Sequence, residues 1–221
     1  MRMTTHNRGY TMRMNERFSI AAFVVLLAVQ AQATTWNATA DFSLAANPNG
    51  AWSYGYANAA GGDYALMIYT AANFAEQPGL NVWNVKTATG VPCVALNTSA
   101  NTYFKWAPGV LGLHPGVTGT ATEHPVVTWT APSNGVYRFT SSFTYVGGGN
   151  GVGPSVTKNL SKGLVAIKSG VIDMSVPVMT WNETLSLVAG DTINWAVNAN
   201  ADNGSDSTVL SAEVTSLPSK N

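Results

Sequence analysis

The sequence predicts an all-β fold, an antiparallel β-sandwich or jelly roll, preceded by a cleaved signal peptide. Three observations predict it. After residue 33, short segments alternate apolar and polar side chains with a period of two. Clusters of Gly, Pro and Asn separate these segments. No later segment shows a long apolar stripe at the 3.6-residue period of a helix.

Residues 1–33 have the three parts of a secretory signal peptide. Arg13 and Arg17 precede the apolar run 18–29, and Ala31-Gln32-Ala33 gives the small-x-small pattern of a cleavage site. The alternative is a membrane anchor, but a run of about 12 residues is shorter than the roughly 20 that a bilayer requires. Met12 and Met14 are alternative start sites. We expect a mature chain of residues 34–221, a single β-sandwich domain, secreted to the extracellular space or the periplasm.

The charge of the expected mature chain narrows its partners. Removing residues 1–33 leaves 7 Lys and Arg against 10 Asp and Glu, a net charge of −3. Nucleic acids and anionic membranes reward a basic face, so this balance disfavours both as partners, and residues 34–221 contain no membrane-anchor pattern. Charged residues make up only 10% of the chain, so Asn, Thr, Ser and Gly must supply most of the polar surface.

The clearest strand is predicted over residues 136–146. Its odd positions are mostly aromatic, whereas Arg138 and Thr140 begin a polar opposite face. A second strand is expected at 124–130, and the turn residues 131–135 between the two predict an antiparallel hairpin. The residues expected on the buried face are Tyr137, Phe139, Phe143 and Tyr145.

Three further strands are expected towards the C-terminus, at residues 184–188, 192–198 and 207–215. Apolar and polar residues alternate in the second of these strands, where Ile193, Trp195 and Val197 share one face. They also alternate in the last strand, where Leu210 and Val214 share one face. The N-terminal half is less regular. Its expected strands are 36–43, 51–57, 64–70, 80–86 and 102–106.

Several segments together resemble secreted bacterial β-sandwich modules, similar in outline to jelly-roll carbohydrate-binding modules. This resemblance implies a sandwich fold and an extracellular binding role, with a glycan as ligand; its motifs are mainly turn glycines, core aromatics and the terminal strand. The segments that carry it are Asp41-Phe-Ser, Asn47-Pro-Asn-Gly-x-Trp52-x-Tyr54-Gly-Tyr56, Val127-Thr-Trp129-Thr-Ala-Pro132, Leu185-x-Leu187-x-Ala-Gly190-Asp191-x-Ile193 and Asp206-Ser-Thr208-x-Leu210.

An aromatic stripe is the candidate ligand-binding feature. Trp52, Tyr54 and Tyr56 fall on one face of an expected strand. Aromatic faces beside a few amides and carboxylates form platforms for sugars, because sugar CH groups stack on the rings while hydroxyls bind polar partners. The same stripe is also the pattern of a packed core, and both interpretations stay open.

The loop 198–206 is rich in oxygen donors and suggests a calcium site. Asp202 and Asp206 lie four residues apart around Asn203-Gly204, where a turn can bring both carboxylates together. Hard Ca²⁺ prefers such oxygen ligands. The alternative is a solvated turn, in which Asn, Asp, Gly and Ser are expected anyway.

Catalytic motifs do not stand out. The chain has no Gly-x-Ser-x-Gly elbow, no His-Glu-x-x-His and no cysteine pair. Cys93 lies in an apolar stretch and is expected to be buried, while His114 and His124 each precede a proline. The leading hypothesis is therefore a non-catalytic secreted module that binds a glycan or polysaccharide. The alternatives are a secreted hydrolase or lyase on the same scaffold, or a structural matrix or surface protein.

Overall fold

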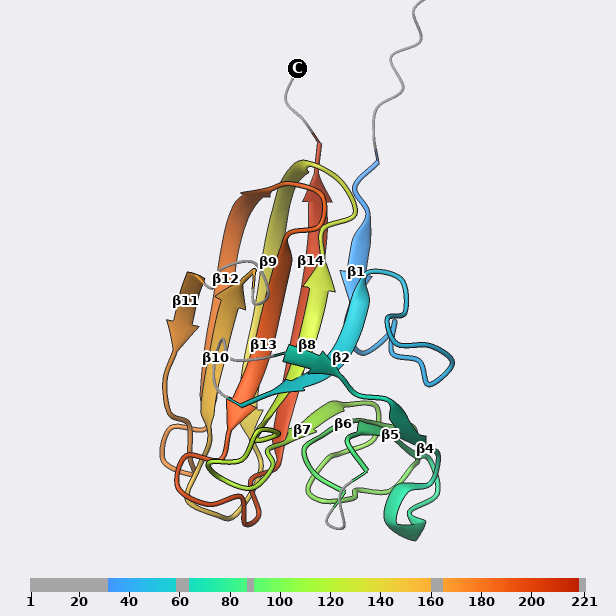
Figure 1. Cartoon of the computed structure of the whole chain (residues 1–221), viewed down its shortest axis with the longest axis vertical. Coiled ribbons are helices and arrows are strands. Elements are labelled where there is room, and N and C mark those ends of the chain that lie inside the picture. Colours follow the sequence, from blue (N-terminus) through green and yellow to red (C-terminus); the bar gives the residue numbers. More distant parts are fainter. Residues whose placement is uncertain (1–31, 59–63, 87–89, 160–164, 219–221) are drawn as a thin grey trace, which may run out of the picture. The chain divides into compact units, whose positions relative to one another are not determined.

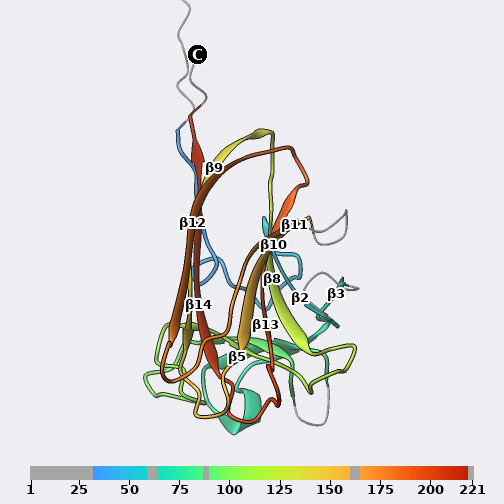
Figure 2. The same ribbon diagram turned by 90° about the vertical axis from the view of Figure 1, so that its left-hand side faces the viewer.

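Segments with alternating apolar and polar side chains form two antiparallel sheets that face each other, as the sequence predicts (Figures 1 and 2). The structure is a computed structural model that describes residues 32–58, 64–86, 90–159 and 165–218. Residues 1–31 of the predicted signal peptide, 1–33, lie outside these residues. The described residues belong to the compact unit Ala31–Asn221.

The larger sheet contains eight strands within the described ranges, in the order β12-β9-β14-β7-β6-β5-β4, with β1 paired to β14. Figure 1 shows β9, β12 and β14 running upright while β4 to β7 turn across one end. The strands are β1 (Thr35–Asn37), β4 (Tyr69–Ala71), β5 (Leu80–Asn84), β6 (Cys93–Asn97), β7 (Leu111–His114), β9 (Gly135–Tyr145), β12 (Val178–Leu187) and β14 (Thr208–Leu217).

The smaller sheet has six strands in the same described ranges, in the order β11-β10-β13-β8-β2-β3. A short 3-10 turn, η1 (Phe74–Glu76), follows β4 of the larger sheet. The strands are β2 (Trp52–Ala57), β3 (Tyr64–Leu66), β8 (His124–Thr130), β10 (Gly153–Lys158), β11 (Val165–Ser169) and β13 (Thr192–Asn198).

The core between the sheets contains the faces that the alternation predicts. On β9 the four aromatic side chains are at most 3% exposed, whereas Arg138 and Thr140 on the opposite face are exposed. On β13, Ile193, Trp195 and Val197 are fully buried. On β14, Thr208, Leu210, Ala212 and Val214 face inwards, so the strand-face predictions for these three strands are confirmed.

Tryptophans join the two layers of this core. The indole Nε1 of Trp195 on β13 donates to Oγ of Ser141 on β9, at 3.0 Å, and that hydroxyl donates to the carbonyl oxygen of Trp181, at 3.2 Å. The rings of Trp181 and Trp195 meet edge to face, with centroids 6.3 Å apart. The buried hydroxyl thus satisfies an indole that would otherwise be left without a partner in the core.

The predicted hairpin between residues 124–130 and 136–146 is wrong. β8 lies in the smaller sheet between β2 and β13, and β9 lies in the larger sheet between β12 and β14. The turn at 131–135 therefore carries the chain from one sheet to the other. It is held to another connection that crosses between the sheets, residues 188–191, because Ala131 N–H donates to the carbonyl of Asp191 and Gly190 N–H donates to the carbonyl of Ala131, each at 2.8 Å.

Other strand boundaries differ from expectation in the N-terminal half. Residues 102–106 form only an isolated bridge between Tyr103 and Trp106. The expected strand 64–70 divides into β3 and β4, which belong to different sheets. β6, β7, β10 and β11 are strands that the sequence pattern did not predict.

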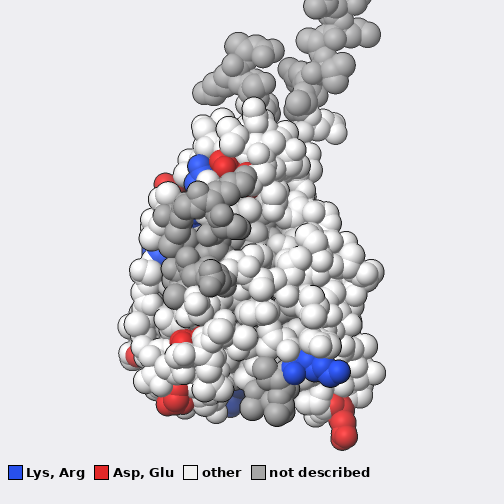
Figure 3. All heavy atoms as spheres, in the orientation of Figure 1, with Lys and Arg blue, Asp and Glu red and all other residues white. Residues whose placement is uncertain are grey.

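The surface is sparsely charged. Figure 3 shows charged side chains scattered among uncharged atoms on the face that it displays. Within the ranges that the structure describes, no helix has the length and apolar character needed to cross a membrane.

We expect Trp195→Ala and Trp129→Ala each to lower the free energy of unfolding by about 3–5 kcal/mol, the usual cost of truncating a buried large aromatic. Both side chains are fully buried. Urea unfolding of each variant measures the change. Ile68→Ala, at a side chain that is 73% exposed, is the control and should leave the midpoint unchanged. Native-like midpoints in both tryptophan variants would contradict the assignment of the core.

Candidate functional site

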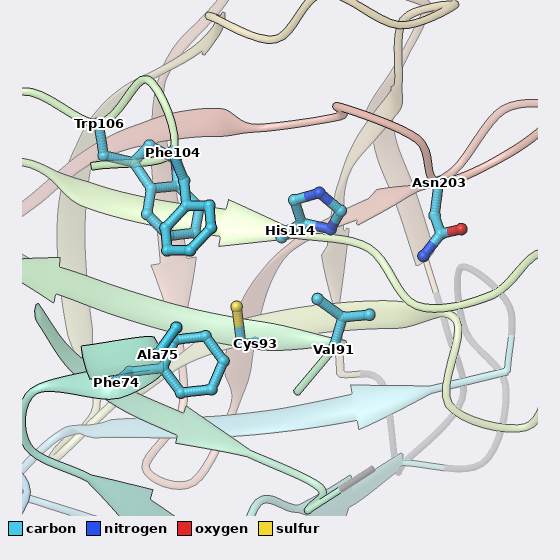
Figure 4. A pocket seen from close by; sticks show the side chains of 8 residues that line it. All are labelled: Phe74, Ala75, Val91, Cys93, Phe104, Trp106, His114 and Asn203. Atoms are coloured by element: carbon cyan, nitrogen blue, oxygen red, sulfur yellow. The ribbon is translucent and has the colours of Figure 1, made fainter. Parts of the chain in front are cut away.

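An open pocket lined by aromatic side chains lies where β6 and β7 turn across the end of the sandwich. We call it the aromatic groove; its volume is about 340 Å³. Figure 4 shows the rings of three aromatic residues gathered at one end and His114 and Asn203 at the other. The lining residues are Phe74, Ala75, Val91, Cys93, Phe104, Trp106, His114 and Asn203.

The aromatic end of the groove is built from a buried base and an exposed ring. Trp106 is 2% exposed, and its Nε1 donates to the carbonyl of Thr208 at 3.1 Å, which fixes the indole. A Cβ on Gly112 of β7 would overlap that indole, so only glycine allows this close approach. Phe104 is 48% exposed and meets Trp106 edge to face, at a centroid distance of 6.1 Å. Its ring is therefore available to a ligand.

A second hollow continues from the first and adds polar groups. Its volume is about 610 Å³, and it shares Phe104 and His114 with the aromatic groove. We call it the polar extension. The residues that it adds are Lys105, Gly148, Ser205 and Ser207, from the β6–β7, β9–β10 and β13–β14 connections.

His114 lies between the two hollows in a defined tautomer. Its Nδ1 lies 2.9 Å from the carbonyl oxygen of Pro115. A carbonyl oxygen can only accept, so Nδ1 carries the proton and Nε2 holds the free lone pair. Burial lowers the pKa of His114, which keeps the imidazole neutral at neutral pH. Nε2 of His114 can therefore accept a hydrogen bond from a ligand hydroxyl.

Cys93 is buried, as the sequence predicts, and is a poor nucleophile. It is 1% exposed. Burial raises the pKa of its thiol to about 12, so the sulfur stays protonated under ordinary conditions. It contributes a small apolar wall to the groove.

Four of the nine described non-glycine residues with left-handed backbone line the two hollows. Ala75, Phe104, Lys105 and Ser205 have φ angles between 50° and 69°. Each such residue other than glycine costs about 1 kcal/mol or more, and this kind of strain persists where function requires it. The strain at Phe104 and Lys105 sets the direction of both side chains at the mouth of the groove.

The predicted aromatic stripe lies elsewhere. Trp52 and Tyr54 on β2 are 1% and 0% exposed, and Trp52 Nε1 donates to Oδ2 of Asp41 at 3.0 Å. Asn47 brackets Tyr54, because its Oδ1 accepts from the Tyr54 N–H and its Nδ2 donates to the Tyr54 carbonyl. Tyr56 is half-buried and packs against the core. Of the two interpretations that the sequence left open, core packing describes where Trp52 and Tyr54 lie.

The predicted carboxylate pair lies beside the polar extension. Asp206, between the lining residues Ser205 and Ser207, is fully buried; its Oδ1 is 3.3 Å from the hydroxyl of Tyr145, and its Oδ2 has no hydrogen-bond partner within the described chain. Asp202 accepts from the Gly204 N–H at 2.8 Å and from Asn150 Nδ2 at 3.0 Å. Burial first, and the charge of Asp202 second, raise the pKa of Asp206 to about 7.

The oxygen atoms around Asp206 and Asp202 meet part of the ligand requirement of a hard cation. The free Oδ2 of Asp206 is a buried ligand atom without a partner, and the neighbouring groups are oxygens rather than nitrogen or sulfur. Groups of three or more His, Cys, Asp and Glu that could hold a metal do not occur in the described residues. A cation here would therefore need backbone carbonyls and water for most of its shell.

His124 occupies a separate, buried position on β8. Its Nε2 lies 3.8 Å from Oε1 of Glu123, and its Nδ1 has no hydrogen-bond partner in the described parts of the chain. Burial lowers its pKa, although the neighbouring Glu123 acts in the opposite direction. It does not line the groove.

No protein-family model matches the chain, and no curated protein matches its sequence. Solved structures with a similar fold include two carbohydrate-binding modules. The family 29 module CBM29-2 is 11% identical over 84% of this chain and 87% of its own, with a TM-score of 0.36. TmCBM61, in complex with β-1,4-galactotriose, is 11% identical over 48% of this chain and 68% of its own, with a TM-score of 0.31. The globular domain of zebrafish complement 1qA protein is 16% identical over 42% of this chain and 69% of its own, with a TM-score of 0.29. Such scores are too low to transfer a function.

The raised pKa of Asp206 predicts a pH-dependent stability. Between pH 4 and 7 the folded chain keeps a proton on Asp206 that the unfolded chain releases, so this residue stabilises the fold below pH 4 and the contribution is lost as pH rises to about 7. Asp206→Asn should gain free energy of unfolding relative to the native chain across this window, by roughly 4 kcal/mol at most.

The comparison with the native chain is needed because His114 and His124, whose pKa values are lowered by burial, change stability in the opposite sense over part of this window. Chemical denaturation at a series of pH values measures the difference. Asp173→Asn is the control, since hydrogen bonds from Ser175 lower the pKa of that exposed carboxyl and its effect lies below pH 4. A constant difference between Asp206→Asn and native from pH 4 to 7 would contradict the prediction.

Proposed function

We propose that the chain is a secreted, non-catalytic binding module that takes a carbohydrate in the aromatic groove. The observation that carries the proposal is the exposed ring of Phe104 beside neutral hydrogen-bonding groups. Sugars present both CH faces and hydroxyls, so they require an aromatic surface and polar partners within reach of one ring.

The two hollows divide these tasks. Phe74, Phe104 and the buried Trp106 offer apolar surface for the CH groups of a sugar. His114 Nε2 and the hydroxyls of Ser205 and Ser207 offer partners for its hydroxyl groups. Because the hollows share Phe104 and His114, a chain of more than one sugar unit has room to extend from one to the other.

Secretion is part of the same proposal. It is supported by the signal-peptide pattern of residues 1–33, and a surface with few charges suits an extracellular β protein. The hydrolase or lyase alternative would take its catalytic groups from loop residues or from the two histidines. Of these, His114 lines the groove with an unprotonated Nε2, whereas the Cys93 thiol remains protonated. The structural-protein alternative requires no ligand in the groove.

We also propose that calcium binds beside the polar extension, with Asp206 and Asp202 as its carboxylate ligands. Its support is the buried Oδ2 of Asp206, which has no partner among the residues described, and the oxygen-rich loop around it. When bound, the ion would neutralise two clustered anions and hold the loop that carries Ser205 and Ser207.

Phe104→Ala should weaken carbohydrate binding by about tenfold, because the variant loses the stacking and apolar area of one ring. A glycan array identifies the ligand, and affinity electrophoresis or calorimetry with that ligand measures the change. Tyr69→Ala is the matched control, since Tyr69 is an aromatic residue on β4 that is 40% exposed and lies outside the groove.

Equal binding by Phe104→Ala and the native chain would contradict the proposed site. Turnover of a polysaccharide that disappears in His114→Ala, with folding retained, would instead support the hydrolase or lyase alternative.

Calcium should raise the melting temperature of the native chain relative to chelator, since a ligand that binds only the folded state stabilises it. The rise should be smaller at pH 5 than at pH 8, because the ion competes with the proton that Asp206 holds below pH 7. Asp206→Asn should abolish the rise, and the Asp173→Asn control should keep it. Identical melting of the native chain with calcium and with chelator would leave the loop as a solvated turn.

A further inference from the structure

The strand β12 forms a long open edge of the larger sheet. It has ten residues and pairs with β9 on one side only, and no other strand in the described ranges pairs with it. The other sheet edges are protected. β1, β3 and β4 have three residues each, while β11 carries Lys168 and a register irregularity in its pairing with β10. Short strands, lysines and bulges are the usual protections against pairing with another chain, and β12 has none of them.

Free backbone groups on β12 can be assigned from its pairing with β9. Tyr145 N–H donates to the carbonyl of Pro177 at 2.7 Å, so position 177 and every second residue after it face β9. The even positions 178 to 186 therefore direct their N–H and C=O groups away from β9. Their side chains are all exposed, on the outer face of the sheet.

Exposed apolar side chains are concentrated around this edge. Val176 is 60% exposed just before β12, Val178 is 47% exposed at its start, and Val188 is 57% exposed just after its end. Met174 and Val171, in the preceding connection, are also exposed. Exposed apolar residues scattered singly need no explanation, but a group along an open strand edge marks an interaction surface.

We propose that β12 pairs antiparallel with β12 of a second copy of this chain, about a two-fold axis at Asn182, to form a dimer with a continuous sheet. An antiparallel strand pair is its own complement under two-fold symmetry, so no second kind of surface is required.

The open backbone groups and the valines select this register. Pairing centred on Asn182 places even positions opposite even positions, which matches the outward hydrogen-bonding groups. Thr180 then lies opposite Thr184 of the second copy. Val176 and Val188 flank the strand, and their backbone groups bond to Asp173 and Asp191 of their own chain. In this register the exposed side chain of Val176 lies near the exposed Val188 of the other copy, at both ends of the edge.

The single charge on the strand is compatible with this register. Glu183 accepts from Nε1 of Trp181 at 2.9 Å within its own chain. A register centred on Glu183 would place two carboxylates opposite each other, whereas the Asn182 register places Glu183 opposite Trp181 of the second copy. No residue of the aromatic groove lies on β12, so the dimer and the ligand site can be tested separately.

Sedimentation velocity of the purified chain over a range of concentrations is the first test, and a reversible monomer–dimer equilibrium is expected. Val176→Lys and Val188→Glu should each weaken self-association by about tenfold or more. A mixture of the two variants, or both changes in one chain, should restore it, because the introduced ammonium group of one copy then faces the introduced carboxylate of the other. The double change to Val176→Lys and Val188→Lys is the matched control and should remain monomeric.

A second measurement checks the axis directly. Opposed residues of a hydrogen-bonded antiparallel pair have Cα atoms about 5.5 Å apart, within the range that a disulfide spans. Asn182→Cys should therefore form a disulfide-linked dimer on oxidation, whereas Thr140→Cys, exposed on the adjacent β9, should not.

Three results would overturn the proposal. One is a native chain that stays monomeric at its highest soluble concentration. Another is a dimer that survives both single charge changes, which would assign the association to a different surface. The third is a failure of the Lys and Glu pair to restore association although each variant melts like the native chain.

Discussion

The contact between Trp195 and Ser141 holds the two sheets in register. A buried indole N–H without an acceptor costs free energy, and for Trp195 the acceptor is a hydroxyl on the opposite sheet. Because that hydroxyl also donates to the main-chain carbonyl of Trp181, one small side chain on β9 bonds both the Trp195 indole of β13 and the backbone of β12. The position of β13 against β9 follows from this contact, and with it the start of the β13–β14 loop that carries Asp202 to Ser207.

The aromatic groove is attached to the two packed sheets by residues outside the Trp195–Ser141 contact. Trp106 forms its base by donating to the carbonyl of Thr208, at the start of β14, where that strand is paired with both β7 and β9. The paired strands therefore form a rigid base below the groove. The mouth of the groove is formed by strained connections at Phe104, Lys105 and Ser205. A rigid base with connections at the mouth is a common arrangement for binding sites on β-sandwiches.

Asp206 lies between the packed sheets and the mouth of the groove. It is buried between two lining serines, and it shares its environment with Tyr145 and Asp202. Burial in this position favours the protonated form of the Asp206 carboxyl, so its ionisation near pH 7 places a charge beside the loop that presents Ser205 and Ser207. The carboxyl whose titration affects the stability of the fold therefore lies next to the polar extension.

The sequence by itself determined the class of fold and the buried faces of β9, β13 and β14, because an alternation with period two specifies which side chains of a strand point to the core. It also located the burial of Cys93. It did not determine which strands pair: turn residues such as those at 131–135 allow a hairpin and a crossing between sheets equally well, and only the tertiary structure decided that β8 and β9 lie in opposite layers.

The same limit applies to the site. Trp52, Tyr54 and Tyr56 gave the stronger periodic signal, yet the regularity that made the stripe visible is that of a core strand. Phe104 and Lys105 lie in the segment 102–106, which the sequence predicted as a strand but which is irregular, and Phe74 lies in η1. The signal that could have marked the groove is the density of aromatic residues at 103–106. The residues of the groove come together because β6, β7 and the β13–β14 loop converge in space, and long-range convergence leaves no local pattern in a sequence.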